Sequence, residues 1–427
     1  MSSTIRRRPR GRQPSWTAGC ALAVLATVAS AAPAWADPAP SYPELLARLD
    51  QTPASVEAGA LAEAAEARVR QARVRPNPNL SLGAENIGGS GPYSGFGAAD
   101  LNLSLSQGLE LWGRRPARVN VARAEAGTAA LRRDLALVDA AGRLALVYAE
   151  AEAAQRRAQL AEEGLSLSLA DARAALLLVE EGREPLLRGV QAESEAAAAR
   201  AALDEAAAER DAAFARLSAA AMLPTPATAV AAGLLDAEVG AQTPNLAPTA
   251  ADAPAVRVAE AERTAAERRI DVERINARPD VTASLGVTRF GAENETALTV
   301  GFSLSLPLFD RNRGNIDAAR AEFRAAEARV AQARQDAGAD RRAATARLSA
   351  SSGRVSAADA GVRAAEEAYR LSRIGAEAGR ISQLELRVTR AALINARSAA
   401  VDARMARVRA EIDLARLDGR APFQGSR

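Results

Sequence analysis

Residues Phe302–Asn315 read Phe-Ser-Leu-Ser-Leu-Pro-Leu-Phe-Asp-Arg-Asn-Arg-Gly-Asn, and their hydrophobic period changes sharply. Up to Leu306, apolar residues alternate with small polar ones, as on a strand with two different faces. After Asp310 the chain runs for tens of residues without proline and is rich in Ala, Arg and Glu, which predicts a long helix. A weaker copy of the stretch lies at Leu103–Arg118. The sequence therefore uses one strand-to-helix junction twice.

The same order of elements surrounds both junctions and predicts a duplicated, mainly α fold with a small β part. Each copy has a helix that ends at an Arg-Pro pair, then two strands, then a long helical hairpin. The first repeat is 37–222, with strands at 79–85 and 100–110 and a helical hairpin at 114–222. The second repeat is 255–419, with strands at 281–289 and 296–306 and a helical hairpin at 312–417. A Pro- and Ala-rich connector, 223–254, joins the repeats, and 420–427 is a polar tail.

The hairpin helices are expected to be very long. Between Arg114 and Glu181 only isolated glycines interrupt the helical pattern, and the one proline, Pro116, lies at the helix start, where it is tolerated. About 67 residues at ~1.5 Å per residue give a helix ~100 Å long, far beyond a globular helix. This length predicts a coiled-coil-like or tunnel-like assembly.

The composition excludes several classes of function. The chain is 48% hydrophobic but only 3% aromatic, which is poor material for a large globular core. It has no His, and its single Cys, Cys20, lies in a segment expected to be removed, so a thiolate or imidazole metal site is excluded. No Walker loop, dinucleotide fingerprint or nucleophile triad is present, so we expect neither a cofactor nor an enzyme.

Residues 1–36 have the features of a secretory signal peptide. Five Arg precede the apolar run Ala18–Ala29, and Ala34-Trp35-Ala36 is a small-x-small cleavage site. Cys20 precedes most of the apolar run, whereas lipidation requires a cysteine after it, so acylation is not expected. The full chain has 55 basic and 52 acidic residues; without these five Arg the balance is 50 to 52, or −2. The mature charge therefore does not indicate a nucleic-acid partner.

The strands have one apolar face and one Ser/Thr/Asn/Gly face, which suits an outer-membrane barrel or a half-buried soluble sheet. The secretory signal and the Ala-rich helices favour the barrel. Aromatic residues near the strand ends fit the interface girdle of such a barrel: Tyr93, Phe96 and Phe290 at one end, Trp112 and Phe309 at the other.

The number of strands predicts an oligomer. An open sheet edge in lipid leaves backbone groups unpaired, and four strands do not close a pore. Two chains give eight strands, a barrel filled by side chains, whereas three chains give twelve strands and room for a conduit. We therefore expect a homotrimer, with the helical hairpins forming a tunnel across the periplasm.

Four segments carry a resemblance to a known family: Pro76–Leu82, Glu85–Tyr93, Leu103–Gln107 and Leu306–Asn315. In this order, and with the duplication, the chain resembles the TolC-like outer membrane efflux proteins, and within them the cobalt-zinc-cadmium branch of heavy-metal resistance. The resemblance implies a homotrimeric channel in outer-membrane lipid that exports heavy-metal cations. It also implies two partners, a periplasmic adaptor and an inner-membrane pump of the resistance-nodulation-division (RND) type.

The helical turns at Gly182 and Gly379 are expected at the periplasmic tip, because glycine permits the left-handed conformation that such turns need. They predict an adaptor-docking site or, alternatively, ordinary hairpin turns. The contact residues would be Arg183, Leu187, Arg380 and Leu384. Glu385, Glu181 and Glu184 could form an acidic ring that gates the lumen, or could be solvated charges at helix ends. Many members of the family have Asp at the Glu385 position.

Two other functions stay open at this stage. One is a duct of the same family for drugs or organic solutes. The other is a periplasmic coiled-coil adaptor or scaffold, which would also be secreted and Ala-rich but needs no lipid-facing strands. Asp310 and Asn312 lie where the long helix needs an N-cap, so we interpret Asp310–Asn315 as a structural elbow.

Overall fold

A computed structural model describes residues 38–231, 233–237 and 252–423 of the chain. The chain divides into two units, Met1–Ala36 and Asp37–Arg427, and every described residue belongs to the second. The expected signal peptide lies outside the described residues, as do residues 238–251 of the connector and the last four residues of the tail.

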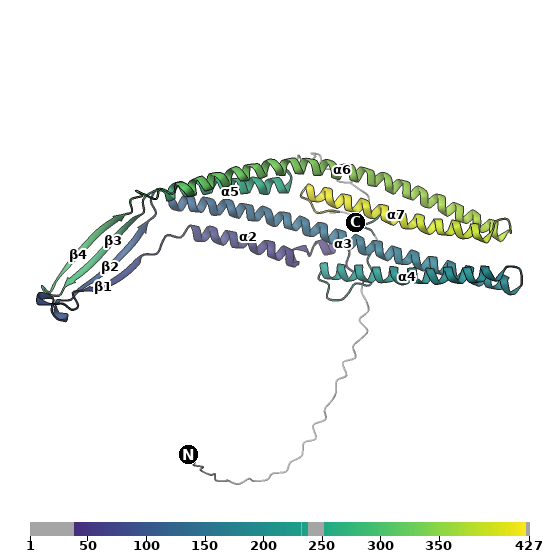
Figure 1. Cartoon of the computed structure of the whole chain (residues 1–427), viewed down its shortest axis with the longest axis horizontal. Coiled ribbons are helices and arrows are strands. Elements are labelled where there is room, and N and C mark those ends of the chain that lie inside the picture. Colours follow the sequence, from purple (N-terminus) through teal and green to yellow (C-terminus); the bar gives the residue numbers. More distant parts are fainter. Residues whose placement is uncertain (1–37, 232, 238–251, 424–427) are drawn as a thin grey trace, which may run out of the picture. The chain divides into compact units, whose positions relative to one another are not determined.

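The described part is mainly helical with one small sheet, which confirms the expected fold class (Figure 1). The helices are α1 Tyr42–Leu46, α2 Pro53–Ala72, α3 Arg114–Glu180, α4 Leu186–Ala220, α5 Pro254–Asn276, α6 Arg313–Glu377 and α7 Gln383–Leu417. The strands are β1 Asn79–Glu85, β2 Asp100–Leu109, β3 Val281–Phe290 and β4 Glu295–Leu304. Short 3₁₀ turns lie at Leu49–Gln51, Gly91–Tyr93 and Phe96–Ala98.

The sheet has the order β1-β2-β3-β4, and all neighbouring strands are antiparallel. The β2–β3 pair joins the two halves of the chain, with Leu105 opposite Leu285. β1 and β4 are the edges of the sheet. Each edge strand therefore has one side without a strand partner among the described residues.

The end of β4 differs from the expectation. The strand stops at Leu304 rather than Leu306 because Pro307 has no N–H to donate to a ladder. The last bond runs from the Ser305 N–H to the Asp280 carbonyl oxygen (3.1 Å), and Leu308 N–H then turns back to Leu306 O (2.9 Å). β2 likewise stops one residue early, at Leu109, whereas β3 continues one residue further, to Phe290.

The start of α6 also differs from the expectation, in the hydrogen bonds that its N-cap residue makes. Asn312 holds the N-cap position with φ +56°, but its side chain makes no cap hydrogen bond. Its Nδ2 instead donates to the carbonyl oxygen (2.9 Å) and the carboxylate (2.7 Å) of Glu273, near the end of α5. The Asp310 carboxylate accepts the Asn312 N–H (2.9 Å) one turn before the helix. The elbow is therefore held to α5 rather than capped by its own side chain.

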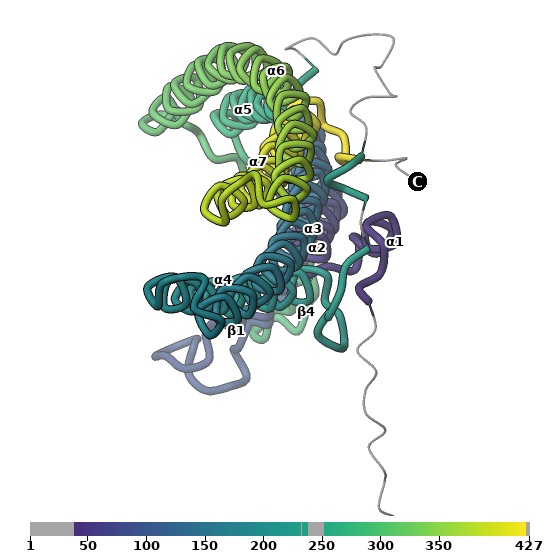
Figure 2. The backbone as a smooth tube through the Cα atoms, turned by 90° about the vertical axis from the view of Figure 1, so that its right-hand side faces the viewer, coloured from purple at the N-terminus to yellow at the C-terminus, as the bar shows by residue number. Residues whose placement is uncertain are grey.

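The long helices pack as two hairpins, α3 with α4 and α6 with α7. α2 lies against α3, and α5 lies against both α6 and α3. In the end-on view of Figure 2, the helices follow one curved layer from α6 through α7 and α3 to α4. α3 has 67 residues and α6 has 65, so each is about 100 Å long at ~1.5 Å per residue.

Arginine–carboxylate pairs line the contact between α3 and α7. Arg390 pairs with Asp171, and seven residues further along α7, Arg397 pairs with Glu163 (2.8 Å). Towards the other end of α7, Arg416 pairs with Asp139 (2.5 Å). These contacts are called the α3–α7 ion pairs below.

The largest apolar cluster of the described residues lies where α1, α3, α4, α7 and residues 227–231 and 233–235 meet. The Tyr42 and Tyr148 rings pack edge to face with 6.0 Å between their centroids. The Tyr42 hydroxyl donates to the Pro422 carbonyl oxygen (2.8 Å), and burial raises the pKa of Tyr42. Tyr42, Tyr148 and Phe214 thus lie in one cluster, whereas Phe323 and Tyr369 of α6 lie outside it.

The described part of the connector is fixed to this level by a buried carboxylate. Glu152, only 1% exposed, accepts the backbone N–H groups of Gly233, Leu234 and Leu235 at 3.0–3.1 Å. Its carboxylate also accepts from Arg156 (2.5 Å). A hydrogen bond from Arg156 holds the pKa of Asp236 below its usual range. Glu152 and residues 233–235 are called the connector clamp below.

Candidate functional site

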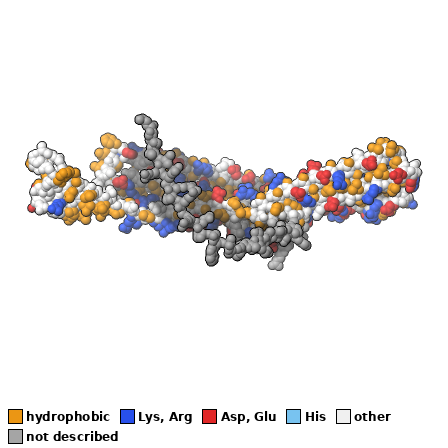
Figure 3. Space-filling view, turned by 90° about the horizontal axis from the view of Figure 1, so that it is seen from below, with side chains coloured by type: hydrophobic (Ala, Val, Ile, Leu, Met, Phe, Trp, Pro, Cys, Tyr) orange, Lys and Arg blue, Asp and Glu red, His pale blue; other side chains and the backbone are white. Residues whose placement is uncertain are grey.

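One face of the sheet is apolar in every strand. Its central row is Leu80, Leu105, Leu285 and Val300, and the next row is Leu82, Leu103, Val287 and Leu298. All eight side chains are exposed. Figure 3 shows hydrophobic side chains gathered over the strands, whereas over the helices charged side chains of both signs are scattered among hydrophobic ones. An exposed apolar surface of this extent is typical of a membrane or protein contact.

The opposite face is small and polar, and its side chains bond across the strands. The Ser81 and Ser104 hydroxyl groups lie 2.6 Å apart. Asn102 Nδ2 donates to the Thr288 hydroxyl (3.1 Å), and the Ser284 hydroxyl donates to the Gly301 carbonyl oxygen (3.2 Å). The two faces of the sheet therefore suit different surroundings, the first an apolar one and the second an aqueous one.

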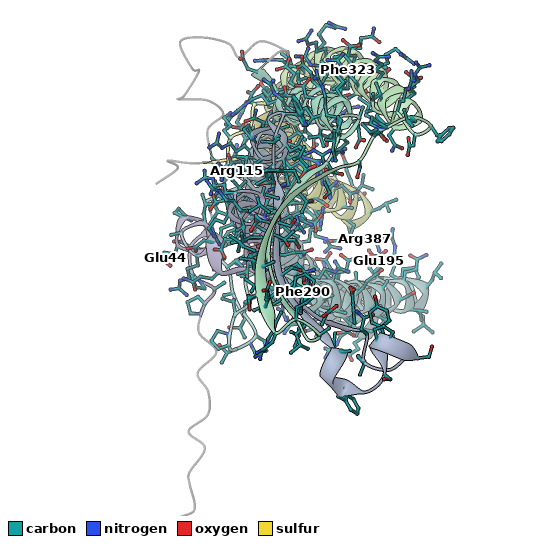
Figure 4. All side chains as sticks on the ribbon, turned by 90° about the vertical axis from the view of Figure 1, so that its left-hand side faces the viewer. Glu44, Arg115, Glu195, Phe290, Phe323 and Arg387 are labelled. Carbon is teal, nitrogen blue, oxygen red and sulfur yellow. The ribbon has the colours of Figure 1, made fainter. Side chains whose placement is uncertain are left out.

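The five candidate interface aromatics lie at the two ends of the sheet. Tyr93 and Phe96 are in the loop after β1, at the end where Glu85 opposes Asp100, and Phe290 closes β3 there. Phe290 is labelled in Figure 4. Trp112 and Phe309 follow β2 and β4 at the other end. Phe309 is 100% exposed and Trp112 is 50% exposed.

Gly291 holds the loop at the Phe290 end, and sequence reasoning missed it. A Cβ on Gly291 would lie 2.4 Å from the Ala99 carbonyl oxygen, and its N–H donates to Asp100 (2.9 Å). Only glycine allows the β3–β4 turn to approach the first loop so closely.

The junction between β2 and α3 binds the junction between α5 and β3, which the sequence did not reveal. Trp112 Nε1 donates to the Pro279 carbonyl oxygen (3.1 Å), and the Arg278 guanidinium lies 5.8 Å from the Trp112 ring centroid. Arg114 donates to the Arg278 carbonyl oxygen (2.7 Å) and pairs with Asp280. This group of five residues is called the junction contact below.

The helical turns at the other end of the long helices have the same geometry. Gly182 has φ +69° and Gly379 has φ +71°. The Arg183 N–H bonds Leu178 O and the Gly182 N–H bonds Val179 O, at 2.8 and 3.0 Å. Arg380 and Gly379 make the corresponding bonds, also at 2.8 and 3.0 Å. Both turns are Schellman motifs, so each glycine has a conformational role.

The docking candidates beside these turns are exposed. Leu187 is 65% exposed and Leu384 is 54% exposed. The structure brings the two hairpins together just behind them, where Arg387 of α7 donates to Glu195 of α4 (2.6 Å; Figure 4). A small cavity of about 40 Å³ there is lined by Leu178, Glu184, Gln383 and Arg387, among others. Arg183 and Arg380 are exposed as well.

The three candidate gate carboxylates have different surroundings. Glu181 pairs with Arg183 (3.4 Å), and Glu184 pairs with Arg188 (3.8 Å). Glu385 is exposed in the first turn of α7, where its N–H donates to the Ser382 hydroxyl (3.2 Å). Of the three, Glu184 lines the cavity between the hairpins.

Replacing Gly379 with Ala should loosen its turn, because the left-handed conformation costs an L-residue about 1–2 kcal/mol. The Gly379 and Arg380 amides should then exchange hydrogen about 5- to 30-fold faster, measured on the folded protein by quenching, digestion and mass spectrometry of the peptides that cover the turn. Gly361→Ala is the control, since Gly361 is inside α6 and has open space around its Cα; it should stabilise its helix by about 1 kcal/mol. Unchanged exchange in Gly379→Ala would contradict the assigned role.

A groove of about 920 Å³ lies among α2, α3, α5 and α6 and carries charges of both signs. Two of its ion pairs join α3 to α5, Arg132–Glu262 (2.5 Å) and Arg269–Glu125 (2.7 Å). Within residues 38–231, 233–237 and 252–423, no group of three or more His, Cys, Asp or Glu is placed to hold a metal ion. None of the helices described is both long and apolar enough to cross a membrane.

Comparison with known proteins gives consistent matches. The profile of the family described as "Outer membrane efflux protein" matches residues 48–221 and 248–420. The nickel-cobalt-cadmium resistance protein NccC of Alcaligenes xylosoxydans xylosoxydans is 41% identical over 283 residues, 66% of this chain and 64% of NccC. The nickel and cobalt resistance protein CnrC of Cupriavidus metallidurans is 42% identical over 283 residues, 66% of this chain and 67% of CnrC. The match thus spans less than two thirds of NccC.

A solved structure supports the fold. The open-state MtrE outer membrane channel of Neisseria gonorrhoeae has a TM-score of 0.75 at 21% identity, covering 90% of this chain and 89% of that chain. The expected resemblance to the heavy-metal resistance branch is confirmed by the sequence matches. Because the family profile matches more than half of its residues, the chain belongs to the outer membrane efflux protein family.

Proposed function

We propose that this protein is a homotrimeric outer-membrane channel that serves as the exit duct of a tripartite pump for heavy-metal cations. The observation that carries the proposal is the sheet, with one continuous apolar face and open edges at β1 and β4. In lipid an open edge leaves backbone groups unpaired, so the edges must be closed by other strands. Three copies would give twelve strands and a lumen lined by the Ser/Thr/Asn/Gly face.

The long hairpins would continue this lumen across the periplasm as a passive conduit. Energy would come from an inner-membrane RND pump, connected through a periplasmic adaptor. The exposed Leu187 and Leu384, each beside a Schellman turn, support an adaptor-docking site at the hairpin end. Arg183 and Arg380 would supply polar contacts around these apolar side chains.

An acidic ring at the hairpin end is proposed as the gate. Three copies of Glu385 would be related by the trimer axis, and rings of carboxylates select cations. Glu385 supports this better than Glu181 or Glu184, because the latter two already pair with arginines of their own turn. The cation would pass the ring as cargo, without a resident metal site.

The cargo is proposed from the relatives, since NccC and CnrC are resistance proteins for nickel and cobalt. Deletion of the protein should lower growth on cobalt, nickel, cadmium or zinc, and expression from a plasmid should restore it. A drug panel tests the alternative cargo of organic solutes. Unchanged metal tolerance together with new drug sensitivity would overturn the metal assignment.

Fractionation tests the location independently of the cargo. We expect the protein in the outer membrane as a trimer that runs at monomer mass only after heating. A soluble periplasmic monomer would contradict the channel and favour the adaptor or scaffold alternative. The apolar sheet face argues against that alternative, because a soluble adaptor would expose this face to water.

A further inference from the structure

We infer that Phe309 and Arg311 of one copy bind Arg75–Asn77 of the next copy, forming between chains the same contact that the chain makes once within itself. The inference rests on the proposed trimer and names the residues that join its copies. Its template is the junction contact, in which Trp112 and Arg114 of the first repeat hold Arg278–Asp280 of the second repeat.

The two sides of the junction contact each recur in the chain. Leu111-Trp112-Gly113-Arg114 corresponds to Leu308-Phe309-Asp310-Arg311. The backbone agrees at the start of this stretch, because Leu111 N–H bonds Leu109 O and Leu308 N–H bonds Leu306 O, both at 2.9 Å. It differs afterwards: Trp112 and Gly113 have positive φ and α3 begins at Arg114, whereas α6 begins two residues after Arg311. On the opposite side, the Arg-Pro pair at 278–279 corresponds to the pair at 75–76, directly after α2.

Among the described residues, Phe309, Arg311 and Arg75 make none of these contacts, although Gln107 of β2 donates to the Pro76 carbonyl oxygen (2.8 Å). Phe309 is 100% exposed, whereas Trp112 is half covered by its contacts. Arg75 and Arg311 are exposed and make no hydrogen bond or ion pair with any other described residue. Phe309 follows the edge strand β4, and Arg75 precedes the edge strand β1. One chain therefore holds half of the contact at each edge of its sheet.

Closure of the sheet would bring the halves together. β2 and β3 are antiparallel neighbours, and the junction contact lies at their shared end. β4 and the next copy's β1 would be neighbours of the same kind. Arg75 would then lie over the Phe309 ring as Arg278 lies over Trp112, and such cation–π contacts favour ring faces. Arg311 would donate to the Arg75 carbonyl oxygen and to the Asn77 side chain, which stands where the second repeat has Asp280.

Cysteine cross-linking tests the contact. Cys20 is the only cysteine, so a Cys20→Ala background is free of thiols. Arg75→Cys and Phe309→Cys are placed on one full-length chain, expressed in the outer membrane and treated with a short bis-maleimide. A disulfide is not used, since it needs Cα atoms about 4.4–6.8 Å apart and an arginine reaches further. We expect covalent dimers and trimers on denaturing gels.

Matched variants define the outcome. The pair Trp112→Cys and Arg278→Cys should link within one chain and leave the mass at that of a monomer. Co-expressed single variants, Arg75→Cys on one chain and Phe309→Cys on another, should give covalent dimers. The mass of the unmodified protein in detergent, measured by light scattering, reports whether it is a trimer at all; an amine-directed cross-linker is not used because the sequence has no Lys. A trimer mass without any maleimide link would overturn this inference, whereas a monomer mass would overturn the proposed trimer as well.

A side-chain variant gives a second readout. Arg75→Ala and Phe309→Ala should each weaken association by about fivefold per interface, from the loss of one cation–π contact. The trimers should therefore dissociate at a lower temperature in detergent, and Phe309→Trp should retain the original temperature. Identical dissociation temperatures for all three variants would contradict the contact.

Discussion

Replacing Leu105 with Arg should prevent assembly in the outer membrane, whereas replacing its neighbour Ser104 with Arg should not. Leu105 lies in the central apolar row, with Leu80 and Leu285 on either side. An arginine at the lipid midplane costs about 2–4 kcal/mol in a membrane barrel, so three copies cost about 6–12 kcal/mol per trimer. That cost is comparable to the whole stability of an ordinary domain.

Ser104 is the matched control because successive residues of a strand point to opposite faces. Its arginine would enter the polar lumen beside Gly286 and lose one hydroxyl contact with Ser81. The measurement is the amount of heat-modifiable trimer in outer-membrane fractions. Equal amounts of trimer in both variants would show that the apolar face does not meet lipid.

The second large effect should come from Glu152→Ala. The connector clamp would lose its acceptor, three backbone N–H groups would lose their partner, and Arg156 would keep only its pair with Asp236. Removing one member of a buried charged network costs about 3–5 kcal/mol. We expect residues 233–237 to become sensitive to protease and the protein to unfold at lower denaturant concentration.

Glu150→Ala is the control for this change. Glu150 lies two residues away on α3 and pairs with Arg409 (3.2 Å) on the protein surface. Exposed pairs contribute about 0–1 kcal/mol, so this variant should unfold nearly as the parent protein does. Equal destabilisation of the two variants would mean that the loss of helix charge, and not the clamp, explains the effect.

The sequence predicted the regular parts of the fold well because their signals are local. Leu101, Leu103 and Leu105 alternate with polar residues, and this alternation predicted the bounds of β2 to within one residue. A strand with one apolar and one polar face requires a hydrophobic period of two. The proline-free run after Asn312 placed the second helical hairpin, which begins one residue later than expected, at Arg313, and ends at Leu417 as expected. Gly182 and Gly379 marked both turns because few other residues adopt a positive φ.

The contacts that hold these parts together could not be predicted in the same way. Arg114 and Asp280 are far apart in sequence, and neither differs in type from the many other charged residues of the helices. The connector looked like a linker because of its prolines, although Leu234 and Leu235 are buried. Asn312 was expected to cap its own helix, but its side chain donates instead to Glu273 of α5, a contact that depends on how the two helices pack.

The α3–α7 ion pairs have a consequence for chemical modification of the protein. The sequence has no Lys and no His, so every cationic partner in these pairs is an arginine. A guanidinium presents its N–H donors in a fixed plane that matches a carboxylate. Acetylation and amine-directed labels remove the charge of a lysine ammonium, and they find no such target in Arg390–Asp171 or Arg416–Asp139. Reagents of this kind should therefore leave the attachment of one hairpin to the other intact.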